Sequence, residues 1–284
     1  MKLRCKDSEI DLSHVAVMGV LNVTPDSFSD GGAWLDPGAA VARALRMAEE
    51  GAAIIDVGGQ STRPGAEEVS EEEEKRRVLP VIERLSAETT VPISIDTRKP
   101  AVARAAIEAG ASILNDESGE DGDAAAVDRV VADTGCGVVV MHTRGDPVTM
   151  LQLTQYSDVV ADVRSYLCRR ADELIAAGVR SDAIAVDPGI GFAKEASQSL
   201  EVLRRLDQLT SLRWPVLVGP SRKSFIGRVL DVPVHDRLEG TAVAVAWAVS
   251  QGAAIVRVHD VKEMVRVVRM TEAIMGGGHI EEPS

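Results

Sequence analysis

The sequence contains eight short apolar runs, rich in Val and Ile, that alternate with longer stretches of helical pattern. Runs of this kind are typical of parallel strands buried on both faces. We predict strands over 15–21, 53–58, 92–96, 112–116, 137–141, 183–187, 215–219 and 254–258. Eight strand–helix units in 284 residues predict one α/β domain over 1–284, a single (β/α)8 TIM barrel with its active site at the C-terminal ends of the strands. An open doubly wound sheet is the alternative.

Several helix boundaries carry sequence signals. Ser70 with Glu73 predicts a capping box ahead of "EEEEKRRVLPVIERL". Ser221 and the pair Asp260–Glu263 predict the starts of the last helices. Residues 1–14 precede the first predicted strand, and we expect them to form a small hairpin or cap at the opposite end of the barrel from the active site.

The formal net charge of −13 argues against a nucleic acid or an anionic membrane as partner, because neither would be attracted over a broad surface. No apolar run is long enough to span a bilayer, and the first residues are too polar for a signal peptide. The three cysteines have no paired spacing, which indicates reduced thiols and a cytoplasmic protein.

Polar side chains gather where the predicted strands end. From the first strand to the eighth, these residues are Asn22; 58–62; Asp96; Asn115 and Asp116; Met141 and His142; Asp187; 221–223; and Arg257 with His259. The starts of the strands carry few charged groups. Because the carboxyl ends of the strands form the catalytic face of a TIM barrel, this asymmetry indicates an active site.

The segment "IVRVHD" (255–260) places a guanidinium and an imidazole two residues apart on a buried strand. Arg257 and His259 therefore share one face. Arg257 could pair with a nearby carboxylate while His259 is a core histidine. Alternatively, both face an anion together with Arg222 and Lys223. The loops after strands seven and eight of these barrels often hold phosphate, which favours a phosphate or diphosphate.

Asp96, Asn115 and Asp187 are short donors and acceptors at other strand ends. Clustered carboxylates could bind a metal. Asp and Asn also suit a flat heterocycle with amino and lactam groups, because Asp accepts two N–H groups and Asn both donates and accepts. The residues alone leave these two interpretations open. Two long Gly-rich loops, 22–36 and 58–68, are either solvent loops or lids over this face.

Taken together, the motifs resemble those of dihydropteroate synthases. The motifs, in chain order, are "MGVLNVTPDSFSDGG", "IIDVGGQSTRPGA", "ISIDT", "ND", "DPGIGFAK", "SRKSFIG" and "RVHD". The resemblance covers nearly the whole chain. It implies condensation of 6-hydroxymethyl-7,8-dihydropterin diphosphate with 4-aminobenzoate to give 7,8-dihydropteroate and diphosphate, with Mg²⁺ as cofactor. It also implies a homodimer and a sulfonamide target.

The resemblance assigns roles residue by residue. Asp96, Lys223, Arg257 and His259 are the catalytic candidates. The pterin is expected to be held by Asp96, Asn115, Asp187 and Lys223, in a slot lined by Met141, Phe192 and Gly219. Diphosphate and its Mg²⁺ are assigned to Asn22, Arg257 and His259, with Thr62 on the phosphate side and Asn22 as the metal ligand. The 4-aminobenzoate pocket is assigned to Phe28, Arg63, Pro64, Lys223 and Ser224.

Three positions depart from the family pattern: Gln60, Glu117 and Pro220. Gln60 replaces a glutamate and is isosteric with it, whereas Glu117 stands where an apolar residue is common near the pterin. Two rival functions remain. A methyltransferase that uses methyltetrahydrofolate would not need "SRKS", "RVHD" or the two loops. A non-catalytic pterin-binding paralogue would have lost one of Asn22, Asp96, Lys223 or Arg257, and all four are present.

Overall fold

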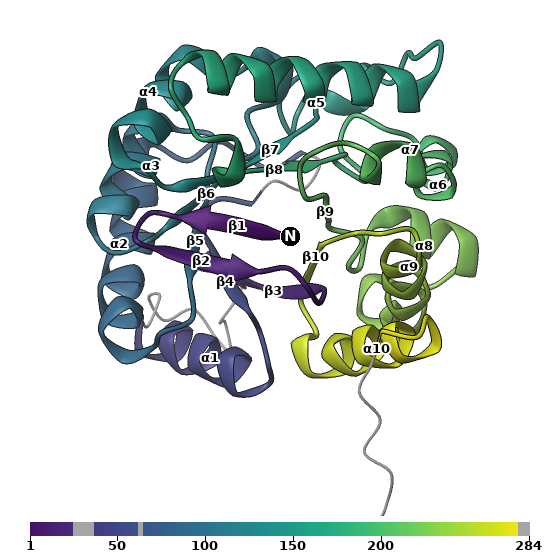
Figure 1. Cartoon of the computed structure of the whole chain (residues 1–284), viewed down its shortest axis with the longest axis horizontal. Coiled ribbons are helices and arrows are strands. Elements are labelled where there is room, and N and C mark those ends of the chain that lie inside the picture. Colours follow the sequence, from purple (N-terminus) through teal and green to yellow (C-terminus); the bar gives the residue numbers. More distant parts are fainter. Residues whose placement is uncertain (25–36, 62–64, 278–284) are drawn as a thin grey trace, which may run out of the picture.

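Eight parallel strands form a barrel in the computed structural model, which describes residues 1–24, 37–61 and 65–277 (Figure 1). The order around the barrel is β8-β7-β6-β5-β4-β3-β10-β9. A bridge between Val186 and Val216 links β8 to the start of β9 and closes the ring. The strands are β3 (Ala16–Asn22), β4 (Ile54–Gly58), β5 (Ile93–Asp96), β6 (Ile113–Asp116), β7 (Gly137–Met141), β8 (Ile184–Asp187), β9 (Leu217–Val218) and β10 (Ile255–Val258). Each coincides with a predicted run, so the TIM barrel is confirmed and the open sheet was the wrong alternative.

Helices surround the barrel (Figure 1). They are α1 (Pro37–Glu49), α2 (Glu71–Glu88), α3 (Pro100–Glu108), α4 (Ala124–Thr134), α5 (Val159–Ala176), α6 (Ala196–Arg204), α7 (Asp207–Thr210), α8 (Ser224–Leu230), α9 (Leu238–Ser250) and α10 (Val261–Ile274). The Ser70 hydroxyl caps α2 by accepting from the Glu73 amide at 3.3 Å. The Glu73 carboxylate instead pairs with Arg76 and Arg77, so only half of the predicted capping box forms. None of the helices in the described parts of the chain is long and apolar enough to cross a membrane.

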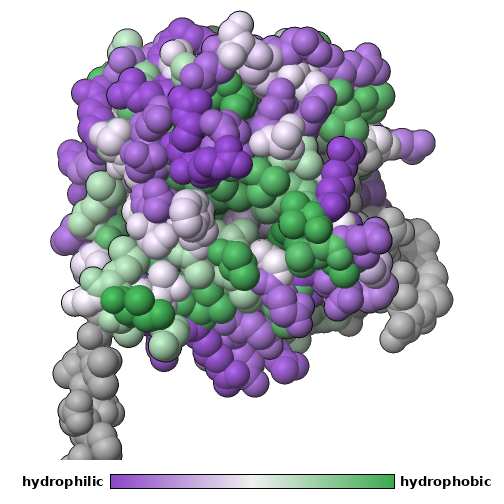
Figure 2. All heavy atoms as spheres, turned by 90° about the vertical axis from the view of Figure 1, so that its right-hand side faces the viewer, coloured by the Kyte–Doolittle hydropathy of each residue, from purple (hydrophilic) through white to green (hydrophobic). Residues whose placement is uncertain are grey.

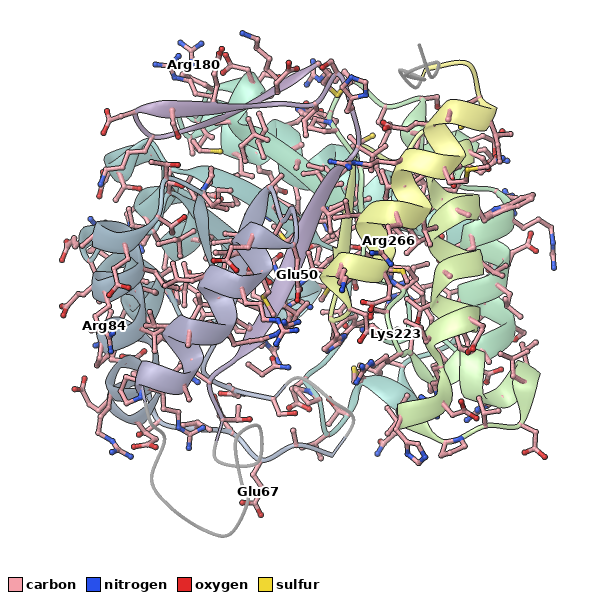
Figure 3. All side chains as sticks on the ribbon, turned by 90° about the horizontal axis from the view of Figure 1, so that it is seen from below. Glu50, Glu67, Arg84, Arg180, Lys223 and Arg266 are labelled. Carbon is pink, nitrogen blue, oxygen red and sulfur yellow. The ribbon has the colours of Figure 1, made fainter. Side chains whose placement is uncertain are left out.

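A hairpin covers one end of the barrel. Its strands, β1 (Lys2–Cys5) and β2 (Ser8–Asp11), pair antiparallel, and the Lys6 amide donates to the Gly135 carbonyl just before β7. Leu3, Cys5 and Ile10 pack against the inward-facing residues at the amino ends of the strands. In Figure 3 the hairpin lies across the upper end of the barrel, whereas Lys223 lies toward the opposite end. The expected cap is therefore present, and it leaves the carboxyl ends of the strands free of this hairpin.

The interior of the barrel is layered because side chains alternate along each strand. The layer next to the hairpin is apolar. It consists of Met18, Ile54, Ile113, Val139, Ala185, Leu217 and Ile255. Two residues further along the strands, the same inward face carries Asp56, Asn115, Met141, Asp187, Gly219 and Arg257. The interior of the barrel is thus apolar at the amino ends of the strands and polar at their carboxyl ends.

Candidate active site

Arg257 forms a buried ion-pair network inside the barrel. Its Nε donates to Asp56 Oδ2 at 2.6 Å, and its Nη2 donates to Asp96 Oδ2 at 2.5 Å. The amide of Asn115 donates to Asp56 Oδ2 at 3.2 Å and to Asp96 Oδ1 at 3.4 Å. Arg257 therefore does pair with carboxylates, which was one of the two interpretations of its position, and it has two such partners. The same network fixes the orientation of Asp96 and Asn115, which were both predicted site residues.

Sequence reasoning missed Asp56. The residue is completely buried in β4, and its Oδ1 has no hydrogen-bond partner among the described residues. A usable signal was present in "IIDVG", because Asp56 follows Ile54 by two positions and so shares its inward face. A carboxylate at such a position needs a buried cation, and Arg257 supplies it.

His259 lies just beyond the end of β10. The Ser221 hydroxyl and His259 Nδ1 are 3.0 Å apart, and the His259 amide donates to Ser221 Oγ at 3.2 Å. Burial, together with the charges of Arg257 and Arg222, lowers the pKa of His259 to about 3. The imidazole is therefore neutral at physiological pH, and its Nε2 remains for contacts other than Ser221.

Two predicted helix caps serve other purposes. The N-cap of α8 is Lys223, and Ser221 bonds to His259 instead. The N-cap of α10 is Asp260, but its carboxylate makes no capping bond. Asp260 instead binds the guanidinium of Arg222 at 2.6 and 3.0 Å. Asp260 is therefore the N-cap of α10 as predicted, although without a capping hydrogen bond, whereas the prediction of Ser221 as an N-cap was wrong, because the N-cap of α8 lies two residues later.

Lys223 lies over an aromatic ring beside Asp187. Its Nζ is 3.8 Å from the centre of the Phe192 ring. Burial lowers the pKa of Lys223 to about 8, against the charges of Glu117, Asp187 and Asp96. Burial also raises the pKa of Asp187 to about 6, although the Gly189 amide donates to its Oδ1 at 2.7 Å. Lys223 can thus donate hydrogen bonds, and Asp187 can accept them, beside the flat apolar ring of Phe192.

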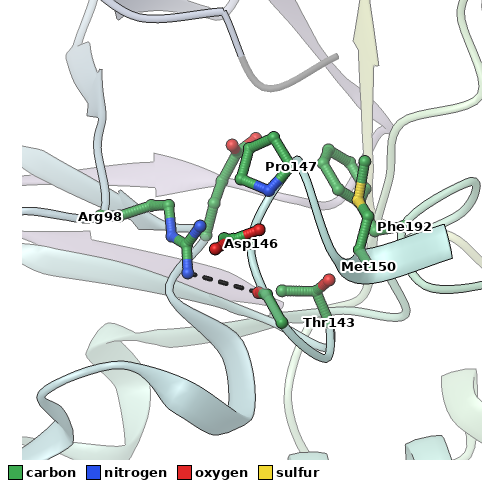
Figure 4. A pocket seen from close by; sticks show the side chains of 8 residues that line it. Arg98, Thr143, Asp146, Pro147, Met150 and Phe192 are labelled. Carbon is green, nitrogen blue, oxygen red and sulfur yellow. Dashed lines mark hydrogen bonds between the residues drawn. The ribbon is translucent and has the colours of Figure 1, made fainter. Parts of the chain in front are cut away.

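Phe192 belongs to a small apolar cluster with Met141, Met150 and Ala193. Gly191 brings the chain close to Lys223: with φ at +79°, a Cβ there would lie 3.2 Å from Lys223 Cδ. A small cavity opens beside this cluster (Figure 4). It is lined by Arg98, Glu117, Thr143, Gly145, Asp146, Pro147, Met150 and Phe192. The site therefore combines charged groups at the strand ends with an apolar wall.

Comparison with known proteins identifies the family of this chain. The family model of pterin binding enzymes matches residues 18–259. The dihydropteroate synthase of Synechocystis is 47% identical and covers 91% of this chain and 89% of its own, and that of Escherichia coli K12 is 46% identical and covers 97% of each. The chain belongs to the dihydropteroate synthase family. The resemblance seen in the sequence motifs is confirmed.

Solved structures of this family share the fold. The Xanthomonas albilineans enzyme with 4-aminobenzoic acid superposes with a TM-score of 0.90 at 42% identity, covering 96% of this chain and 98% of that one. The same enzyme with 7,8-dihydropteroate gives 0.87 at 40% identity, with coverages of 97% and 99%. The Yersinia pestis synthase in a sulfonamide drug complex gives 0.90 at 41% identity, with coverages of 97% and 100%.

The remaining predicted residues divide into two groups. Asn22 ends β3 opposite Gly58, Gly219 lies next to Arg257, and Ser224 is exposed at the start of α8. Four family positions lie outside the described residues: Phe28, Thr62, Arg63 and Pro64.

Gln60 lies near the start of the 58–68 loop that follows β4. Its Oε1 accepts from Lys99 Nζ at 2.6 Å and from the Val69 amide at 3.2 Å. Lys99 also donates to the buried Glu74 at 2.6 Å. A glutamine supplies both acceptor functions here without adding a second negative charge beside Glu74. Gln60 therefore links Lys99 to the Val69 amide without a charge of its own.

No group of three or more His, Cys, Asp or Glu residues that could hold a metal occurs in the described ranges. The oxygens of Asp56 and Asp96 accept from Arg257 and Asn115, an arrangement suited to N–H donors. A Mg²⁺ ion usually needs few protein ligands, because it keeps waters and binds substrate phosphates. Asn22, with a hard amide oxygen at the end of β3, fits that limited role.

Proposed function

We propose that this protein condenses 6-hydroxymethyl-7,8-dihydropterin diphosphate with 4-aminobenzoate, giving 7,8-dihydropteroate and diphosphate. The observation that carries the proposal is the convergence of Asp96, Asn115, Asp187 and Lys223 on the carboxyl-end face of the barrel beside Phe192. This set complements the lactam and amino edges of a pterin. Relatives named dihydropteroate synthase, at 40–47% identity over nearly the full chain, support the same reaction.

The pterin is proposed to lie between the charged groups and the apolar wall. Asp96 and Asp187 accept from ring N–H groups, whereas Asn115 and Lys223 provide donors. Met141, Phe192 and Gly219 line the slot. Phe192 presents its ring to Lys223 at 3.8 Å, and no carboxylate of the described residues is bonded to the ammonium group. That leaves its N–H groups for a ring oxygen or nitrogen of the ligand.

The diphosphate is proposed to lie near Asn22, Arg257 and His259, with Thr62 alongside. Arg257 uses Nε and Nη2 for Asp56 and Asp96, so Nη1 is its group for an anion. Neutral His259 can offer Nε2–H while Nδ1 is bonded to Ser221. Asn22 would hold Mg²⁺, which when bound neutralises charge on the leaving diphosphate.

In the proposed reaction the bond between the pterin methylene carbon and the diphosphate oxygen breaks first. The bonding electrons leave with diphosphate, and the resulting cation is delocalised into the pterin ring. The Asp96 carboxylate stabilises that positive charge electrostatically. The amino nitrogen of 4-aminobenzoate then bonds to the methylene carbon and loses a proton. This route uses no protein nucleophile.

The proposal is tested by incubating the purified protein with both substrates and Mg²⁺ and quantifying dihydropteroate and diphosphate. Equal amounts of the two products, formed only when 4-aminobenzoate is present, are expected. Binding of the pterin with no turnover would instead indicate a non-catalytic paralogue. Methyl transfer from methyltetrahydrofolate, with no dihydropteroate formed, would indicate the methyltransferase alternative.

Substrate binding is expected to be ordered. The 4-aminobenzoate pocket is assigned to Phe28, Arg63 and Pro64 together with Lys223 and Ser224, and bound diphosphate with Mg²⁺ is expected to complete that pocket. Calorimetric titration of 4-aminobenzoate should show tight binding only when diphosphate and Mg²⁺ are present, and a sulfonamide should compete in the same titration. Equally strong binding without diphosphate would contradict the order.

A homodimer and a cytoplasmic location complete the proposal. Figure 2 shows apolar side chains gathered over α6, α8 and α9. They line a groove that includes Leu200, Phe225, Val229, Leu230, Val243 and Trp247. Val243 is 71% exposed and Val229 is 60% exposed, a concentration that a second copy of the chain would bury. Cys5, Cys136 and Cys168 are free thiols, which supports a reducing compartment.

Val243→Glu should convert the dimer to a monomer, because it places a charge in the centre of the apolar groove. Sedimentation or light scattering at several protein concentrations measures the change. Val148→Glu is the matched control, since Val148 is 63% exposed and lies outside the groove. A monomeric parent protein at high concentration, or a Val243→Glu variant that stays dimeric, would contradict the proposed interface.

A further inference from the structure

Lys194 is a buried lysine at the end of the loop 188–193, which follows β8. Only 3% of the residue is exposed, and the proposed reaction does not use it. Its Nζ donates to the carbonyls of Gly189 and Phe192, both at 3.1 Å, and to the carbonyl of His142 at 3.4 Å. These carbonyls replace the water that a lysine amine otherwise binds. The amine therefore joins its own loop to the residue that follows β7.

The surroundings make the Lys194 amine a donor toward His142. Burial, with the charges of Lys194 and Arg144, lowers the pKa of His142 to about 2, so the ring is neutral. His142 Nδ1 lies 3.0 Å from Lys194 Nζ and accepts from it, which leaves the ring proton on Nε2. Burial also lowers the pKa of Lys194 to about 7. Both the ammonium group and the neutral amine can donate to the carbonyls around them.

The loop 188–193 has an unusual backbone conformation. Its φ angles are +65° at Gly189, +79° at Gly191 and +45° at Ala193. Residues with a Cβ rarely adopt this region. At Gly189 the chain lies directly against β7, because a Cβ there would be 2.0 Å from the His142 carbonyl oxygen. Such a conformation persists only where surrounding contacts hold it, and the bonds from Lys194 to Gly189 and Phe192 are contacts of this kind.

The same loop supports two residues assigned to the pterin. The Phe192 ring centre lies 3.8 Å from Lys223 Nζ, and a Cβ at Gly191 would lie 3.2 Å from Lys223 Cδ. The Gly189 amide donates to Asp187 Oδ1 at 2.7 Å. A shift of the loop would therefore move the Phe192 ring, the support of the Lys223 side chain and a donor to Asp187 together.

We propose that Lys194 is a positioning residue of the pterin slot. Its amine holds the loop 188–193 in the conformation that places Phe192 and Gly191 against Lys223 and the Gly189 amide against Asp187. Lys194 acts through these residues and does not touch the ligand. The identity of the ligand rests on the proposed function, whereas the positioning of Phe192 rests on the contacts of this chain alone.

Lys194→Met tests the proposal, because it keeps an unbranched side chain and removes every N–H donor. Two other bonds to the loop remain, from Tyr156 Oη to the Ala193 carbonyl at 2.9 Å and from the Gly191 amide to Ser199 Oγ at 3.2 Å, so the variant is expected to fold. Calorimetric titration with 6-hydroxymethyl-7,8-dihydropterin should give a Kd raised at least about tenfold, since several hydrogen bonds from one donor are lost. The number of binding sites per protein should stay at that of the parent.

This pair of quantities separates positioning from a merely structural role. A variant that is only less stable has fewer folded molecules, so its number of sites and its kcat fall together while the Kd of the remaining sites is unchanged. That result would overturn the proposal. With both substrates present, a positioning role should instead lower kcat/KM for the pterin diphosphate more than it lowers kcat.

Arg170→Met is the matched control. Arg170 is also only 3% exposed, and it bonds to Asp128 and Glu173 on the outer helices α4 and α5. Its replacement should lower the stability, yet leave the Kd for the pterin within about twofold of the parent value, because no pterin residue depends on it. A Kd raised equally in Arg170→Met and Lys194→Met would show that any lost buried cation weakens binding, and would overturn the specific role of Lys194.

A second measurement needs no ligand. The chain contains three phenylalanines, so labelling with 4-fluorophenylalanine gives three fluorine NMR signals, and Phe192→Leu identifies that of Phe192. In Lys194→Met the Phe192 signal should shift or broaden, while the signal of the buried Phe225 stays in place. If Lys194→Met does not fold, Lys194→Gln, which keeps one amide donor, should show the same changes to a smaller extent.

An unchanged Phe192 signal in the folded variant would overturn the positioning role whether or not a pterin binds. Failure of the parent protein to bind the pterin would count against the proposed function alone, and the fluorine signals would then still decide whether Lys194 positions Phe192.

Discussion

Replacing Arg257 with glutamine is expected to lower the free energy of unfolding by about 3–5 kcal/mol, the scale for removing one partner of a buried ion pair. The reason is specific to this barrel. Arg257 is bonded to Asp56 and Asp96, and its loss would leave two buried carboxylates without their cation. Denaturant unfolding of both proteins measures the difference, provided that each unfolds in a two-state transition.

The pH dependence of this loss supplies an independent check. Without Arg257, the folded-state pKa of Asp96, which burial already raises, should rise further, because the charge that opposes this shift is gone. Stability of Arg257→Gln should therefore fall relative to the parent as pH rises through the folded-state pKa of Asp96 in the parent, because the folded variant then retains a proton that the folded parent has lost. Protonation at low pH should partly rescue the variant.

Arg222→Gln is the matched control. Arg222 also donates two side-chain hydrogen bonds to carboxylate oxygens, both of them on Asp260, but its side chain is 39% exposed. An exposed pair of this kind contributes about 1 kcal/mol or less. If Arg257→Gln were no more destabilising than Arg222→Gln, the buried ion pairs of Arg257 would not be a main contribution to the free energy of unfolding. The proposed anion contact of Arg257 would then have to be judged from ligand binding alone.

Lys223→Ala is expected to lower turnover at least about tenfold, because a lost hydrogen bond from a charged group contributes roughly 1.5–3 kcal/mol. Lys223 lies between the pterin slot, where its Nζ is 3.8 Å from the Phe192 ring, and the side assigned to 4-aminobenzoate. Steady-state measurement of dihydropteroate formation tests the expectation. Lys262→Ala, which removes an exposed lysine of α10, should leave turnover within about twofold.

The pH profile separates a catalytic role of Lys223 from a structural one. Burial lowers its pKa to about 8, so the ammonium group loses its proton as pH rises through that value. Turnover of the parent should decline above about pH 8, and the residual turnover of Lys223→Ala should lack this alkaline limb. Near-normal turnover of a folded Lys223→Ala protein would contradict the assignment.

The sequence by itself determined the barrel and the face that carries its site. Eight Val- and Ile-rich runs at regular spacing predict buried parallel strands, and parallel strands joined by helices place all carboxyl ends at one edge. Asp96, Asn115, Asp187 and Arg257 could be assigned to that edge because each is the last or next-to-last residue of a strand. These inferences need only local periodicity and chain order, which the sequence contains.

The tertiary structure alone decided which groups meet inside the barrel. Asp56 and Arg257 are 201 residues apart in sequence, yet they form an ion pair because β4 and β10 lie on either side of β3 and both side chains point into the interior. Ser221 and Asp260 have the residue types of helix caps, but they bond to His259 and Arg222 because those partners lie closer in space. Contacts of this kind depend on register and curvature summed over the whole barrel, and no local pattern encodes them.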